Sequence, residues 1–263
     1  MEEKKLDIKP ELEKLRSMYK SDTSQDSFNL LLLGESGTGK TSLATTCRGP
    51  VFIDSFDPGG TKGLSKEIAA GHVYVDTRWE AEDPKNPSAF IAWEKEFERR
   101  LKEGFFNGIG TYVLDSATTW GDAIMNSVLK RAGIPGEAPR FTKDYGPQKI
   151  IIRSKLQKML SLPCDFILTG HLEAQKDEVN GKVKWRFLTT GKGVVTIPLL
   201  FDELYVTTTK ESSKGVKYQL LTARTSTYMA ATRIGRGKFE VYEEPDIKAL
   251  LKKAGKRCTD MEV

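Results

Sequence analysis

The feature that most constrains this chain is an apolar run followed by a glycine-rich loop. The apolar run covers residues 28–33 and leads into Gly34-Glu35-Ser36-Gly37-Thr38-Gly39-Lys40-Thr41, which has the spacing G-x-x-x-x-G-K-[ST]. A helical stretch from Ser42 to Arg48 follows, and Gly49-Pro50 ends it. A strand, such a loop and a helix in this order form a phosphate-binding P-loop. The sequence therefore predicts a buried strand that ends at a polyphosphate site.

Each part of this loop has a physical role. Glycines let the backbone curve around a polyphosphate with several N–H groups pointing inward, and the positive end of the helix dipole faces the same anion. We expect Lys40 to reach the β and γ phosphates of ATP, and the Thr41 hydroxyl to ligate Mg²⁺. The nucleotide contacts are expected from Gly34, Glu35, Ser36, Gly37, Thr38, Gly39, Lys40, Thr41 and Ser42.

Composition sets wider limits on the class of protein. A chain of 263 residues that is 38% hydrophobic can bury a full core. It has no run of 18 apolar residues, and its first residues do not read as a signal peptide, so we expect no membrane association and a cytoplasmic location. Three widely spaced cysteines and two histidines indicate reduced thiols instead of a disulfide framework or a zinc site.

The positive charge is unevenly distributed. Residues 130–158 contain eight basic side chains against Glu137 and Asp144, whereas the whole chain has a net charge of only +5. Such a concentration is typical of a surface that meets a polyanion, although a solvated helix face gives the same pattern. We select Arg140 and Lys143 as candidate nucleic-acid contacts in this segment.

Strand and helix patterns alternate along the chain. Alternation of this kind predicts right-handed crossovers and a mainly parallel sheet flanked by helices, the α/β class. The last two strands, joined through residues 210–215, are expected to form an antiparallel hairpin at the sheet edge. The expected strands are 51–54, 72–75, 111–115, 165–169, 204–208 and 218–222, and the expected helices are 87–103, 121–131 and 148–162. We expect a helix and lead-in at 1–27, an ATPase core at 28–243, and a basic helix and tail at 244–263.

Acidic and polar residues follow several expected strands, where ligands of α/β folds collect. The apolar run 112–114 ends at Asp115, which we expect to hold the water shell of the Mg²⁺ that Thr41 contacts. Asp57 follows the strand that begins at Val51 and is the candidate to orient or deprotonate water, although an aspartate that only caps the turn fits equally well. His171 follows another strand, where it either senses the γ phosphate or is an ordinary loop histidine.

A second hairpin follows His171. Asn180-Gly181 lies between two short extended runs, which is a strong hairpin signal. After the turn, basic residues alternate with apolar ones, so that Lys182, Lys184 and Arg186 face away from Trp185. A cationic ribbon with aromatic rings suits single-stranded nucleic acid, because cations follow phosphates and rings stack on bases. An amphipathic hairpin whose apolar face packs on the domain explains the same pattern.

Together these segments resemble the RecA-type recombinase ATPase core, and especially small bacteriophage nucleotide-binding or single-strand annealing proteins. The matching pieces span residues 28–222 and comprise Gly34–Thr41, Val51–Asp57, Tyr112–Ser116, Leu168–His171, and Thr189–Gly193 leading into Leu204–Val206. The resemblance implies a RecA-like P-loop fold with ATP between subunits of a ring or filament. It also implies two DNA-binding loops, here residues 130–148 and 173–192. Family members complete the site with a cation from the next subunit, for which Lys210, Arg224 and Arg233 are candidates.

Two positions depart from the family pattern. Phe56 stands where the family has its catalytic Glu, with Asp57 beside it, and His171 replaces a glutamine that senses the γ phosphate. Hydrolysis is therefore expected to be slow, or ATP to act mainly as an assembly ligand.

The function that we expect is an ATPase, phage-encoded and stimulated by DNA, that binds single-stranded DNA and promotes annealing or recombination. It would act as a homo-oligomer in the host cytoplasm, with a single-strand DNA-binding protein as a possible partner. A P-loop helicase or loader-type motor with the same core is one alternative. A small-molecule kinase is another, but a kinase needs a substrate pocket lidded by arginines, whereas this chain has an extended basic segment and a hairpin.

Overall fold

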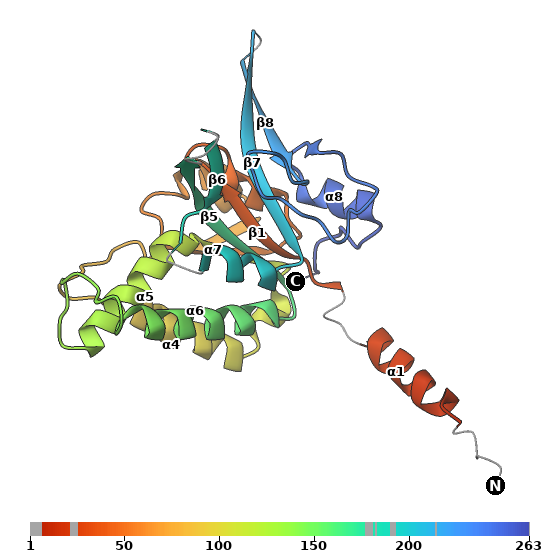
Figure 1. Cartoon of the computed structure of the whole chain (residues 1–263). Coiled ribbons are helices and arrows are strands. Elements are labelled where there is room, and N and C mark those ends of the chain that lie inside the picture. The colour runs from red at the N-terminus through yellow and green to blue at the C-terminus, as the bar shows by residue number, and fades with distance from the viewer. Residues whose placement is uncertain are drawn as a thin grey trace.

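Figure 1 shows the computed structural model, in which a twisted sheet carries helices on both faces. The structure describes residues 7–21, 26–176, 181, 183–189, 193–213 and 215–262. The strands are β1 (Asn29–Gly34), β2 (Val51–Ser55), β3 (Val73–Asp76), β4 (Thr111–Asp115), β5 (Asp165–Lys176), β6 (Val183–Phe187), β7 (Glu203–Ser212), β8 (Gly215–Leu221) and β9 (Tyr242–Glu243). The helices are α1 (Lys9–Ser21), α2 (Lys40–Leu43), α3 (Ser65–Ala69), α4 (Ala89–Lys102), α5 (Ala117–Arg131), α6 (Tyr145–Leu160), α7 (Gly193–Thr196) and α8 (Ile247–Ala254), with 3₁₀ turns η2 (Ala44–Thr46), η3 (Lys62–Leu64), η4 (Phe105–Gly108) and η5 (Pro198–Leu200).

The sheet has the strand order β3-β2-β4-β5-β1-β7-β8-β9. The strands from β3 to β7 pair in parallel, whereas β8 and β9 extend the sheet in the antiparallel direction. The expected fold class is therefore confirmed, including the antiparallel hairpin at the carboxyl-terminal end. Because β1 lies between β5 and β7, its carboxyl end opens near the middle of the sheet edge.

The central strands are apolar along their whole length because both faces of the sheet are covered. On one face Leu31 belongs to a core that contains Trp93 of α4 and Trp120 of α5. On the other face Leu32 belongs to a core that contains Leu43 of α2 and Leu250 of α8. A strand buried on both sides reads as a continuous apolar run instead of an alternating one, which explains residues 30–33.

Strand β5 is longer than the sequence indicates and serves two pairings. Its first half, up to His171, pairs in parallel with β1. From Leu172 onward it pairs antiparallel with β6 and so leaves the main sheet. The expected second hairpin is present, but its turn at residues 177–180 and Lys182 lie outside the described residues. Strand β5 thus carries the γ-phosphate candidate His171 and pairs directly with β6, which carries the basic residues Lys184 and Arg186.

The helices nearest the two ends of the chain differ in whether they pack on the sheet. Helix α1 extends away from the body in Figure 1, and all of its residues are exposed. Helix α8 packs on the sheet through Ile247 and Leu250, begins at an Asp246 cap and ends at Gly255, which has a left-handed φ of 78°. No helix in the described part of the chain is both long enough and apolar enough to cross a membrane.

Candidate nucleotide-binding site

The glycine-rich loop leaves β1 at Gly34 and enters α2 at Lys40. Gly37 and Gly39 have left-handed φ values of 77° and 90°, which favour glycine. Gly34 is required by close packing, because a Cβ there would lie 2.1 Å from the hydroxyl oxygen of Thr207 on β7. The glycines of the motif are therefore required for two different reasons: backbone conformation at Gly37 and Gly39, and close packing at Gly34.

Lys40 is buried at the base of the loop. Its Nζ donates to the carbonyl oxygens of Gly34 and Glu35, each at 2.9 Å. Burial lowers the pKa of the Lys40 ammonium, and the nearby Asp115 and Asp57 carboxylates partly oppose this. The amine is thus already at the loop, and a polyphosphate there would replace backbone carbonyls as its partner.

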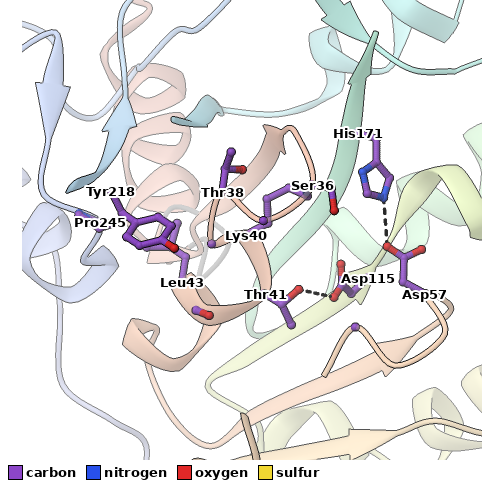
Figure 2. A pocket seen from close by; sticks show the side chains of 14 residues that line it. Ser36, Thr38, Lys40, Thr41, Leu43, Asp57, Asp115, His171, Tyr218 and Pro245 are labelled. Atoms are coloured by element: carbon purple, nitrogen blue, oxygen red, sulfur yellow. Dashed lines mark hydrogen bonds and ion pairs between the residues drawn. The ribbon is translucent and has the colours of Figure 1, made fainter. Parts of the chain in front are cut away.

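The Mg²⁺ candidates meet directly. The Thr41 hydroxyl donates to Asp115 Oδ2 at 2.9 Å, as Figure 2 shows, and Thr169 donates to the other carboxylate oxygen. Burial raises the pKa of Asp115, and the hydroxyl partners only partly offset this. One carboxylate and one hydroxyl suit Mg²⁺, which usually takes few protein ligands together with phosphate oxygens and water. Consistently, the described residues include no group of three or more acidic, histidine or cysteine side chains that could hold a metal alone.

The two candidates for the γ-phosphate side also touch each other. His171 Nε2 lies 3.1 Å from Asp57 Oδ2 (Figure 2), while Ser116 and Thr119 donate to Asp57 Oδ1 at 2.9 and 2.5 Å. Burial alone would raise the pKa of Asp57, but the hydrogen bonds from His171, Thr119 and Ser116 outweigh it and lower the pKa. Asp57 is therefore a carboxylate held ionised by its partners, and it fixes the orientation of the His171 ring.

These groups line one cavity of about 550 Å³. The P-loop, Asp57, Asp115 and His171 form its polar side, and Leu43, Tyr218 and Pro245 stand at its other side (Figure 2). A cavity of this size suits a nucleotide, with phosphates at the loop and an aromatic ring available to the base.

Several residues in this cavity or beside it were not expected from the sequence. Thr169 and Thr207 support residues of the cavity: the Thr169 hydroxyl donates to Asp115, and the Thr207 hydroxyl lies 2.7 Å from that of Thr38. Both are polar residues near the ends of buried strands, which is a signal that sequence reasoning can use. Tyr218 and Pro245 carry no such signal, because β8 and the segment before α8 reach the loop only through the folding of the edge hairpin. Glu80 was also missed: it accepts from Ser55 Oγ at 2.7 Å and from the Gly59 N–H at 2.8 Å, and so fixes the loop that carries Asp57.

Some of the candidate nucleic-acid residues already have partners within the chain, and others are exposed. Arg140 is paired with Asp144 at 2.9 Å, and Arg186 with Glu173 at 2.8 Å. Lys143 and Lys184 are exposed, and Lys182 lies outside the described residues. Trp185 is half-buried and stacks on Tyr228, with ring centroids 6.4 Å apart and planes 15° from parallel.

The candidates for a cation supplied to a neighbour lie at different edges. Lys210 is exposed on β7 beyond the P-loop edge, and Arg224 is exposed in the segment after β8. The Arg233 side chain pairs with Asp202 at 2.7 Å, and its backbone N–H donates to Glu203, the first residue of β7. Since β7 runs parallel to β1, Arg233 lies at the sheet edge opposite the P-loop.

Known proteins give the following comparisons. Residues 27–234 match the family model described as AAA domain. No curated protein matches the chain in sequence. Among solved structures, the chain is similar to a KaiC-like protein from Pyrococcus horikoshii OT3 (15% identity, 78% of this chain and 82% of that chain, TM-score 0.41). It is also similar to the flagellar accessory protein FlaH from Methanocaldococcus jannaschii (14% identity, 82% and 83%, TM-score 0.41). A third is an ATPase from the type III secretion system of pathogenic bacteria (15% identity, 71% and 55%, TM-score 0.43).

Proposed function

The chain belongs to the AAA domain family, and from this premise we propose that it is a RecA-like P-loop ATPase that binds single-stranded DNA and promotes strand annealing or recombination. ATP binding, or slow DNA-stimulated hydrolysis, controls its affinity for single-stranded DNA. It acts as a ring or filament of identical subunits, in the host cytoplasm if a phage encodes it, and its partner is a single-strand DNA-binding protein.

The observation that supports this proposal best is the double role of β5. His171 closes the parallel half of β5 beside Gly34 of the P-loop. The antiparallel half begins at Leu172 and pairs with β6, which carries Lys184 and Arg186. A shift of His171 toward a γ phosphate therefore acts on the strand that holds the basic hairpin. Such a connection is expected in a protein whose nucleotide state changes its affinity for a polyanion.

The residues of the cavity have different roles at the phosphates of ATP. Backbone N–H groups of the P-loop and the Lys40 ammonium hold the polyphosphate. Asp57 keeps the His171 ring in place by accepting from its Nε2–H. The ring nitrogen left for the γ phosphate is Nδ1, which donates to it when the ring carries both protons. Thr41 and Asp115 would hold Mg²⁺, which when bound neutralises charge on the phosphates. Asp57 accepts three hydrogen bonds from described residues. It is therefore not free to deprotonate water at the γ phosphate, and none of the other groups named here supplies a carboxylate for this step. This supports slow hydrolysis.

The test combines two assays on the full chain. ATP hydrolysis is measured with and without single-stranded DNA, and annealing of complementary labelled strands is measured with ATP, ADP or no nucleotide. We expect DNA to raise hydrolysis and ATP to raise annealing, and Lys40→Ala to abolish both effects while the protein stays folded. A protein that hydrolyses ATP but neither binds nor anneals single strands would refute the DNA part of the proposal and leave the ATPase part standing.

A further inference from the structure

The basic side chains of residues 130–158 differ in the structure, because some have partners within the chain and others do not. Most of its cations are neutralised or tied to backbone. Lys155, for example, lies 2.9 Å from a Glu94 oxygen and 2.8 Å from a Glu98 oxygen. By contrast, Lys143, Lys149 and Arg153 are exposed and form no ion pair with any residue that the structure describes. The uncompensated charge therefore lies between residue 143, just before α6, and residue 153, in the middle of this helix.

Two of these three cations stand at the rim of an apolar cavity. Lys149 and Arg153 are four residues apart on α6, so their side chains share one face of the helix. That face borders a cavity of about 420 Å³, whose other wall is formed by Thr189 and residues 193–200. Ile152, Leu156 and Ile197 are among the residues that line it, and no acidic side chain lines it in the described part of the chain. An apolar floor with a cationic rim suits a flat ring attached to a phosphate.

An exposed aromatic ring precedes the same helix. Phe141 is 87% exposed, and its ring centroid lies 6.3 Å from that of Tyr145, the first residue of α6. An aromatic ring so exposed beside a cationic segment is free to stack on a base of a single strand. Trp185 differs, because it already stacks on Tyr228 within the chain.

The cavity wall is connected to the nucleotide site. The Leu188 N–H donates to the carbonyl oxygen of His171 at 2.8 Å, and the next residue, Thr189, lines the cavity. A movement of His171 therefore acts on the cavity through a single backbone hydrogen bond.

We propose that the groove between α6 and the segment of Thr189 and residues 193–200 is a subsite for single-stranded DNA. Lys149 and Arg153 contact successive phosphates, the apolar cavity receives one base, and Phe141 stacks on another. This subsite rests on the proposed function and names the surface that carries it. The charge pattern selects a nucleic acid over an apolar helix of a second copy, which would gain nothing from two unpaired cations at the rim.

The test measures the binding of a labelled oligothymidylate, and of an abasic strand of the same length, to the full chain over a range of salt concentrations. The double variant Lys149→Ala/Arg153→Ala should reduce the magnitude of the log–log salt slope by about 1.4, and the affinity at 0.1 M salt by about 25-fold, because each single-strand phosphate contact adds roughly 0.7 to the slope. Phe141→Ala should weaken oligothymidylate binding by roughly fivefold or more without a change in slope, because it removes a stacked base. It should leave the binding of the abasic strand unchanged.

The matched control is Lys66→Ala/Lys252→Ala, which removes the same charge from two exposed positions on α3 and α8. Thermal unfolding of each variant shows that lost affinity is not lost folding. If wild type binds single strands but the α6 double variant matches the control, the subsite is refuted and the proposed function stands. If wild type binds no single strand, both fail. The double variant could also change the oligomeric state, measured as molecular mass in solution, and keep its DNA affinity. That result would assign the groove to contact between copies of the chain and refute the subsite.

Discussion

At the scale of single residues, the nucleotide site depends on charges that the fold holds away from water. Lys40 and Asp115 line the same cavity. Burial lowers the pKa of Lys40 and raises the pKa of Asp115, so it favours the neutral form of each. A bound polyphosphate therefore stabilises the charged form of Lys40, and a bound Mg²⁺ stabilises the charged form of Asp115. A site of this kind binds Mg²⁺ and polyphosphate together more readily than either alone.

The raised pKa of Asp115 predicts how Mg²⁺ dependence changes with pH. Because burial disfavours the carboxylate, Asp115 takes up a proton at a higher pH than an exposed aspartate does. We expect the gain in ATP affinity that Mg²⁺ provides to fall as the pH is lowered through this raised pKa. Titration calorimetry of ATP with and without Mg²⁺ across that range measures the gain. Asp115→Asn is the control, because its remaining pH dependence comes from ATP itself; identical pH profiles in both proteins would rule out this role.

Tyr218 is predicted to contact the base of the nucleotide. Its ring stands at the cavity beside Pro245, and its Cδ1 lies 3.5 Å from the position that a Cβ on Gly39 would take. Tyr218→Ala should weaken ATP binding by about 1 kcal/mol, the usual worth of an aromatic contact, whereas Tyr218→Phe should not. Binding of inorganic tripolyphosphate should be equal in all three proteins. An equal loss for ATP and tripolyphosphate would mean that Tyr218 shapes the loop and does not contact the base.

The sequence allowed the prediction of that part of the site which local patterns encode. Residues 34–41 form one continuous motif, and Asp115 and His171 each end an apolar run, so parallel pairing brings them to one edge. The pairing of β8 with β7 was expected from the sequence, but the contact that it brings to the P-loop was not. Tyr218 lies at the loop because of where the paired β8 passes relative to β1, and a local pattern does not specify that position.

At the scale of elements, a buried carboxylate connects α4 to the sheet. Asp54 of β2 accepts from Trp79 Nε1 at 2.8 Å and Arg100 at 3.1 Å on one oxygen. Its other oxygen accepts from Trp93 Nε1 at 2.9 Å and the Tyr112 hydroxyl at 2.8 Å. Asp54 and Asp57 are similar in sequence as acidic residues near a strand end, but Asp54 is part of the core and Asp57 faces the cavity.

Asp54→Asn should therefore destabilise the fold strongly. The amide presents N–H donors toward two existing donors and leaves the Arg100 charge without one of its partners, so we expect a loss of about 3–5 kcal/mol in unfolding free energy. Urea unfolding measures this loss. Glu103→Gln, in an exposed ion pair with Arg99 at the end of α4, is the matched control and should change little. A small effect of Asp54→Asn would show that the cluster does not hold α4.

The lengths of the elements were harder to predict than their existence. The expected strand 165–169 is in fact the first part of β5, which continues to Lys176 because the hairpin with β6 gives its backbone a second set of partners. β7 likewise continues past the expected Thr208 to Ser212, where it pairs only with β8. Both extensions lie beyond the core, so hydrophobic patterning could not show them.

At the scale of the whole molecule, the edge hairpin projects beyond the body of the subunit. Figure 1 shows β7 and β8 continuing past the sheet on the side of the P-loop edge. Lys210 lies on this projection opposite Lys217, which pairs with Glu244 at 2.5 Å, whereas Lys210 itself forms no ion pair in the described part of the chain. Of the three cations considered for a neighbouring site, Lys210 thus lies on the P-loop side without a counter-charge, and Arg233 lies on the opposite side with one.

We therefore predict that Lys210 acts in a neighbouring subunit, where its charge stabilises the γ phosphate in the transition state. Lys210→Ala and Lys40→Ala should each be inactive alone, because one lacks the donated cation and the other lacks the P-loop amine. An equal mixture that exchanges subunits should recover about one quarter of wild-type ATPase activity, since that share of random head-to-tail interfaces joins an intact P-loop to an intact Lys210. Arg233→Ala, as the matched control, should keep its activity unmixed. The prediction is wrong if Lys210→Ala alone hydrolyses ATP like wild type, or if every exchanged mixture stays inactive.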